Sequence, residues 1–228
     1  MAKSGPVSAS VNRRRYVSPS RAAAAAQTRE RVVRAARELF ASNGWEGTPI
    51  VEVARRADVS VDTVYATVGR KPVLLRQVVD TVLGEGRGPV PAERRRYVED
   101  VRAAATAPEK ITAYAGGLGR VMPEVAPLLL ALRDAGTSDP DCAAAWHEVV
   151  DRRAENMRSF AADLRGTGEL RPDLDDATVA DLVWATNSPE YYTLLTSRGW
   201  TVERYVEHLT DLWCRLLITA RRPRGRSR

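Results

Sequence analysis

The chain has 228 residues, of which 44% are hydrophobic and 28% are charged, and this balance is typical of a folded protein with one large or two modest domains. No apolar run approaches the length of a membrane span, and the N-terminus lacks the apolar core of a signal peptide, so we expect neither an anchor nor a leader. The only cysteines, Cys142 and Cys214, fall in different predicted helices, which argues against a disulfide framework and fits a reducing cytoplasm.

Positive charge is concentrated at the two ends of the chain. Residues 1–26 and 220–228 each carry +5 and contain no acid, whereas the whole chain carries +6, so residues 27–219 carry −4. The tails therefore concentrate the attraction to phosphate.

Residues 1–17 are polar, basic and aperiodic, which predicts a disordered arm. Arg13–Arg15 either lie along a DNA minor groove or belong to a solvated tail. Arg21 is closer to the folded domain and is the better candidate for a phosphate contact. Ser18-Pro19 starts a first helix that runs to about Ser42 and ends at Asn43-Gly44.

The next segment, Thr48–Lys71, predicts two short helices joined by a tight turn. Thr48 is the expected N-cap of the first helix, with Pro49 in its first position. Asp58 tolerates the left-handed backbone of the turn, and Ser60 caps the second helix. This second helix packs by its valines and turns a small polar face outward, as a helix that enters a major groove would.

From Arg29 to Leu83 the chain resembles the DNA-binding domain of the TetR family of bacterial transcriptional repressors. The residues at the family's spacing are the Leu39-Phe40 pair, Gly44, Thr48, Ala54, Val59-Ser60, Thr63, Tyr65, Lys71 and Leu74-Leu75. The chain departs from the family pattern at Asp58, Val61, Asp62, Thr67 and Val68, so its recognition helix lacks the usual basic residue and carries an acid.

The resemblance implies that the domain binds double-stranded DNA at an operator. We expect most of its contacts to hold phosphates, while Asp62, Thr63 and Ala66 face the bases. The expected DNA-binding residues are Arg21, Thr48, Ser60, Val61, Asp62, Thr63, Tyr65, Ala66, Thr67 and Lys71.

A further helix, 72–83, follows Lys71. The lysine at the start of this helix either binds a phosphate or is an ordinary solvated side chain. The Gly/Pro-rich stretch 84–91 then marks a domain boundary. We therefore divide the chain into a basic arm (1–17), a helix-turn-helix domain with its linker helix (18–83), a ligand-binding and dimerisation domain (92–220) and a basic tail (221–228).

The second domain shows helical periodicity throughout, and the chain has no convincing strand pattern, so we predict an all-α protein. Expected helices span 92–106, 107–121, 123–135, 139–165, 175–188, 189–197 and 201–220. Asp139-Pro140 and Thr201 are helix starts, and Gly136 and Gly166 are helix ends.

Two late helices carry broad apolar faces that indicate either core packing or a subunit interface. The resembled family dimerises by pairing two such helices from each subunit, so we expect a homodimer. The expected interface residues are Val179, Leu182, Val183, Val202, Tyr205, Val206, Leu209, Trp213 and Leu216.

Large, adaptable side chains on several helices either fill the core or line an apolar ligand pocket. Asn187 and Tyr192 are the expected polar groups of such a pocket. The candidate ligand-binding residues are Tyr114, Leu118, Met122, Trp146, Val150, Met157, Trp184, Asn187 and Tyr191.

Nothing in the sequence indicates an enzyme, a metal site or a cofactor. His147 and Asp151 could share one helix face, but two ligands make no metal site, and the catalytic motifs of hydrolases and nucleotide-binding enzymes are missing. We therefore predict a cytoplasmic, homodimeric regulator, most simply a repressor released from a palindromic operator by a small apolar or aromatic effector. The alternative is a helical interaction protein with a degenerate DNA-binding domain.

Overall fold

The computed structural model describes residues 19–83 and 96–219; the expected arm, the 84–91 boundary and the basic tail lie outside these residues. The described part contains α-helices and no strand, which confirms the all-α prediction. The helices are α1 (Pro19–Asn43), α2 (Ile50–Ala57), α3 (Val61–Val68), α4 (Lys71–Leu83), α5 (Arg96–Ala103), α6 (Ala107–Ala135), α7 (Pro140–Arg165), α8 (Asp176–Thr186), α9 (Pro189–Thr196) and α10 (Val202–Leu217).

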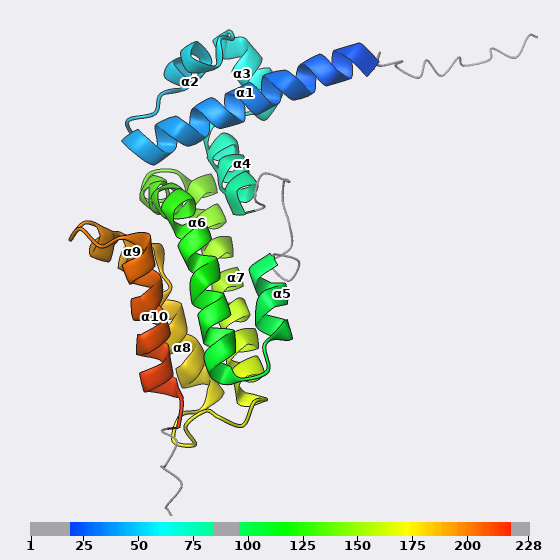
Figure 1. Cartoon of the computed structure of the whole chain (residues 1–228). Helices are drawn as coiled ribbons and strands as arrows, with labels where there is room; N and C mark the ends of the chain where they lie inside the picture. Colours follow the sequence, from blue (N-terminus) through cyan, green and yellow to red (C-terminus); the bar gives the residue numbers. More distant parts are fainter. Residues whose placement is uncertain (1–18, 84–95, 220–228) are drawn as a thin grey trace, which may run out of the picture.

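The helices form a long bundle with a smaller three-helix unit at one end (Figure 1). In that unit, α1 lies across the end of the bundle with α2 and α3 beside it, and α4 connects the unit to the bundle. The central helix α6 contacts α1, α4, α5, α7, α9 and α10, so it carries most of the packing between distant parts of the chain.

The single helix α6 replaces the two helices predicted over 107–121 and 123–135, so that prediction was wrong. Pro123 and Pro127 lie inside α6. A proline removes one backbone hydrogen bond and usually interrupts a helix, which is why the sequence favoured a break at Pro123. Here Met122 and Val125 on either side are buried, and this packing holds the helix continuous.

By length and composition α6 could cross a membrane, and it is the one described helix of which this is true. However, 61% of its most apolar window is buried inside the protein. Its apolar residues therefore serve the core of the bundle.

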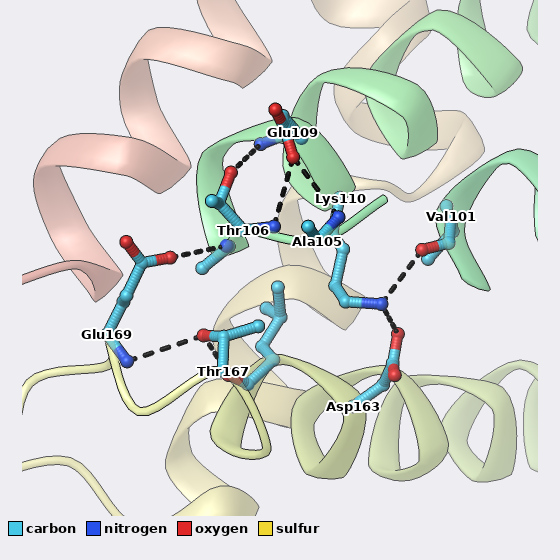
Figure 2. Close-up of polar contacts among 10 residues, drawn as sticks. Val101, Ala105, Thr106, Glu109, Lys110, Asp163, Thr167 and Glu169 are labelled. Carbon is cyan, nitrogen blue, oxygen red and sulfur yellow. Dashed lines mark hydrogen bonds and ion pairs between the residues drawn. The ribbon is translucent and has the colours of Figure 1, made fainter. Parts of the chain in front are cut away.

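Side-chain caps fix the starts of the bundle helices. Asp139 accepts hydrogen bonds at the start of α7 and Thr201 does so at the start of α10, as predicted. At the start of α6, Thr106 and Glu109 form a reciprocal capping box, and the Glu169 carboxylate accepts a hydrogen bond from the Ala107 amide at 2.7 Å (Figure 2). Helix α10 ends at Leu217, earlier than predicted. The next residue, Ile218, adopts an extended conformation and forms a β-bridge with Leu170.

Candidate functional site

Helices α2 and α3 form a helix-turn-helix. Asp58 adopts the predicted left-handed conformation between them, with φ 54°, and Ser60 Oγ accepts a hydrogen bond from the Thr63 amide at 3.1 Å. Val64 and Val68 are buried against the unit's core. The sequence therefore predicted both the turn and the inward face of α3 correctly.

The opposite face of α3 is open. Asp62, Tyr65 and Ala66 are exposed, and Thr63 and Thr67 are half-buried. Of these, Thr63 shares a 2.8 Å hydrogen bond between its hydroxyl and that of Ser60. The face is thus small and polar and carries one negative charge and one exposed aromatic ring.

A residue that the sequence reading did not single out holds the far end of α3 in place. Arg29 of α1 donates to the Thr67 carbonyl at 3.2 Å and to Gln77 Oε1 of α4 at 2.8 Å. Gln77 in turn donates to the Val68 carbonyl at 3.3 Å. These bonds fix the orientation of α3 relative to α1 and α4.

Thr48 does not cap α2, contrary to prediction. Its side chain is fully buried and donates to the Gly44 carbonyl at 2.8 Å, while Pro49 occupies the N-cap position without a side-chain bond. Because Pro49 follows, Thr48 lies one residue too early for its hydroxyl to reach the free amides of the helix. A buried Thr48 side chain positions the turn before α2 and presents no surface to DNA.

Lys71 lies at the start of α4, as expected; its side chain is half-buried and its amine is bound to Trp45. Lys71 Nζ donates to the Trp45 carbonyl at 2.6 Å and lies 4.1 Å from the centroid of the Trp45 ring. Burial lowers the pKa of Lys71. The lysine therefore ties the turn after α1 to the first residue of α4. Nothing is described of the Arg21 side chain.

The bundle contains a cavity of about 390 Å³ lined by α4, α5, α6, α7 and the C-cap of α8. Five of the predicted ligand residues line it: Tyr114, Leu118, Met122, Met157 and Asn187. Lining residues that the sequence reading missed are Leu83, Val98, Val101, Arg102, Val121, Val125, Leu129, Arg153, Asn156, Ser159, Phe160 and Asp163.

The other four predicted ligand residues, Trp146, Val150, Trp184 and Tyr191, do not line the cavity. On α7, Trp146 and Val150 lie on the same face as Arg153, Met157 and Phe160, but one to two turns nearer the start of the helix, beyond the cavity lining. Arg153 lies four residues before Met157 and therefore on the same helix face, and this spacing could have identified it as a lining residue. Tyr191 instead pairs its hydroxyl with His208 Nε2 at 2.7 Å, between α9 and α10. Tyr192, the second expected polar group, is buried against Tyr205 and also lies outside the lining.

A polar network crosses the cavity wall at Asn187. Its Nδ2 donates to the Tyr114 hydroxyl at 2.7 Å and to Met157 Sδ at 3.0 Å, and its Oδ1 accepts from Arg153 Nη2 at 2.6 Å. The same Nη2 donates to the Trp184 carbonyl at 3.1 Å. Asn187 is only 2% exposed, so these bonds satisfy a buried amide.

The wall formed by α5 is tied down by a buried lysine. Lys110 Nζ donates to the Val101 carbonyl and to Asp163 Oδ2, each at 2.9 Å (Figure 2). This places the Asp163 carboxylate, which lines the cavity, beside a positive charge from α6. The ion pair therefore neutralises the lining carboxylate and joins α5, α6 and α7.

The predicted dimer residues are mostly core residues of their own chain. Val179, Val183, Tyr205, Leu209 and Trp213 are fully buried in the single subunit, whereas Leu182, Val202, Val206 and Leu216 are half-buried. The apolar face of α10 packs against α6, and that of α8 packs against α7. The outward face of α10 is charged instead, with Glu203, Arg204, Glu207, Asp211 and Arg215 exposed.

No group of three or more potential metal ligands occurs within residues 19–83 and 96–219. His147 and Asp151 are both exposed on α7. Burial raises the pKa of the Cys142 thiol to about 11, which disfavours the thiolate that acts as a nucleophile or a metal ligand.

A helix-turn-helix joined through a connecting helix to a helical bundle is the architecture of a class of DNA-binding transcriptional regulators. Residues 32–77 match the family described as "Bacterial regulatory proteins, tetR family", and residues 107–213 match the domain described as "Tetracyclin repressor-like, C-terminal domain". The chain belongs to the TetR family of transcriptional regulators.

Solved structures show the same fold. A transcriptional regulator from Saccharomonospora viridis, crystallised with choline, is 18% identical with a TM-score of 0.66 over 86% of this chain and 100% of its own. A TetR regulator from Chloroflexus aurantiacus is 22% identical, with a TM-score of 0.65 over 87% of this chain and 100% of its own. The regulator FadR from Bacillus subtilis, in complex with stearoyl-CoA, is 19% identical, with a TM-score of 0.62 over 80% of this chain and 96% of its own. No curated protein sequence matches the chain significantly.

Proposed function

We propose that this protein is a cytoplasmic, homodimeric repressor that binds a palindromic operator through α3 and is released when a small, largely apolar effector fills the bundle cavity. The observation that carries the proposal is the position of α4. Its first residue, Lys71, is bound to Trp45 beside the helix-turn-helix, and its last residue, Leu83, lines the cavity. One rigid element thus touches both sites.

The proposed mechanism is thermodynamic linkage. A ligand that favours one placement of α4 shifts the separation of the two recognition helices in a dimer, which must match successive major grooves about 34 Å apart. The effector then weakens operator binding by the same factor by which the operator weakens effector binding. For proteins of this kind the coupling is typically about 1–3 kcal/mol.

DNA contact is proposed for the exposed face of α3 and its flanks. In this proposal Ser60, Tyr65 and Thr67 hold phosphates, and Asp62, Thr63 and Ala66 meet base edges. Val61, Lys71 and Arg21 complete the proposed set, while the buried Thr48 is left out. With few direct donors on α3, specificity draws on DNA shape as well.

The proposal is tested by titrating the purified protein against the duplex that flanks its own gene, with random duplex of equal length as control, at two salt concentrations. We expect selective binding, a palindromic footprint spanning two half-sites, and a dimer on the DNA by sedimentation. Affinity equal to that for random duplex at low salt would contradict the assignment for that operator and favour an interaction protein.

A further inference from the structure

The cavity wall contains a positive charge that no carboxylate of the described residues neutralises. Among the described residues Arg153 donates two hydrogen bonds, both from Nη2 and both to neutral oxygens, the Trp184 carbonyl and Asn187 Oδ1. Its guanidinium also lies 5.3 Å from the centroid of the Trp184 ring. A guanidinium has five N–H donors, so its Nε and Nη1 groups remain for another partner.

The nearby carboxylates are committed elsewhere. Asp163, which shares the cavity lining, is bound to Lys110 at 2.9 Å. Glu190, the acid that acts on Arg153 at longer range, is bound to Arg133 at 2.9 Å. Arg153 thus keeps its full charge in a half-buried site, and burial lowers its pKa.

A half-buried cation is costly unless an anion meets it, and the side of the cavity formed by α6 is largely apolar. Leu118, Met122, Val125 and Leu129 line it from successive turns of α6. Arg153 therefore supplies a charged fork for a carboxylate, while the α6 side chains supply a surface for an apolar chain.

We propose that the effector is an amphiphilic carboxylate, with its head group on Arg153 Nε and Nη1 and its apolar part against the α6 wall. This inference rests on the proposed function and narrows the class of effector. The cavity of about 390 Å³ equals the volume of about 13 waters at about 30 Å³ each. A medium-chain fatty acid has about this size.

The test uses decanoate as the probe, with decanol and decylammonium as matched neutral and cationic ligands, in calorimetric titrations of the full chain below micellar concentrations. Decanoate should bind at least tenfold more tightly than decanol, and decylammonium should bind most weakly. R153M should weaken decanoate binding by roughly ten- to hundredfold, the range for a charged hydrogen-bonded partner, and leave decanol binding almost unchanged.

The control variant is R152M, which removes the same charge from the adjacent, exposed position of α7 and should change neither affinity. R153K keeps the charge without the planar fork and should bind decanoate with intermediate affinity. Should R153M fail to fold, R153K and the comparison of the three ligands on the natural chain still test whether Arg153 binds a carboxylate.

Equal affinity for decanoate and decanol, or a decanoate affinity that R153M leaves unchanged, would overturn the anionic effector and leave the cavity as a ligand site. If none of the three ligands binds, the inference also fails. The operator titration is measured separately, so a failure of the proposed DNA-binding function is recognised independently.

Discussion

Asp62 is exposed in the first turn of α3, at the position where the resembled family places glycine and next to Val61, where it places a basic residue. A carboxylate is stabilised at a helix N-terminus, but it repels the phosphates of a nearby duplex. Its presence on the outward face is therefore useful only if it meets a donor on a base. The amino group of cytosine is the donor that a carboxylate reads in the major groove.

We expect D62A to lose discrimination at one base pair of each half-site, by about 1–3 kcal/mol, because the alanine no longer accepts from cytosine. Affinity for random duplex should rise slightly, because one repulsive charge is removed. Competition titrations with single-base operator variants measure both effects. D181A, which removes an exposed acid from α8, is the control, and unchanged discrimination at every position in D62A would exclude base reading by Asp62.

At the scale of helices, the contact between α6 and α10 depends on the absence of a side chain at Gly119. A β-carbon built there would lie 2.4 Å from Val206 Cγ2, whereas one built at Gly116 would lie no closer than 3.9 Å to any neighbour, the end of Arg120. The two glycines share one helix, so they differ mainly in what they face.

Replacing each of these two glycines by alanine is expected to change the stability of the protein in opposite directions. G119A should lower the free energy of unfolding by about 1–3 kcal/mol, because the stiff β-branched Val206 must move to make room. G116A should raise it by about 0.5–1 kcal/mol through better helix propensity. Denaturant titrations compare both with the natural chain, and a stabilised G119A would show that α10 is not closely held to α6.

The capping box at the start of α6 makes the stability of that helix depend on pH. Glu109 accepts hydrogen bonds from the Thr106 and Ala105 amides, at 3.0 and 3.1 Å, and these bonds lower its pKa below the ordinary 4.5 (Figure 2). The unfolded chain then binds more protons than the folded one between the lowered pKa and 4.5. The carboxylate's contribution is therefore complete above pH 4.5 and is lost as the pH falls through the folded pKa.

We expect E109Q to melt at a lower temperature than the natural chain at pH 7, with the difference shrinking at acidic pH as Glu109 becomes protonated in both states. E30Q, which alters an exposed acid of α1, should melt like the natural chain at both pH values. Thermal unfolding followed by circular dichroism measures these differences. A difference that stays constant down to pH 3 would mean that the ionised cap is unimportant.

At the scale of the whole molecule, three exposed ion pairs join α1, the turn before α4, and α4 itself to the bundle. Arg37 binds Glu124 at 2.9 Å, while Arg70–Asp141 and Arg76–Glu148 each span 2.5 Å. Exposed pairs contribute little stability singly. Their placement between α1 or α4 and the bundle, however, makes them sensitive to any movement between the two parts.

We expect E148R to change the free energy of unfolding by less than about 1 kcal/mol. The same variant should reduce the factor by which effector weakens operator binding, because two positive charges now separate α4 from α7. The charge swap R76E/E148R should restore that factor, as judged from operator titrations with and without effector. If the coupling factor of the charge swap is as low as that of E148R alone, this ion pair takes no part in the coupling.

The helix-turn-helix was readable from the sequence because its signals are local. A left-handed Asp58, a capping Ser60 and valines spaced along α3 each act within a few residues, and the all-α class follows from periodicity in the same way. The continuous α6, the buried Thr48 and the engaged Lys71 were not readable, because contacts with residues distant in the sequence decide them. Only the folded bundle shows that Val183, Leu209 and Trp213 belong to the core, and that Arg153 borders the cavity with neutral partners. Apolar and basic residues look alike in sequence whether they face a core, a ligand or a partner, since the tertiary structure alone sets what lies opposite.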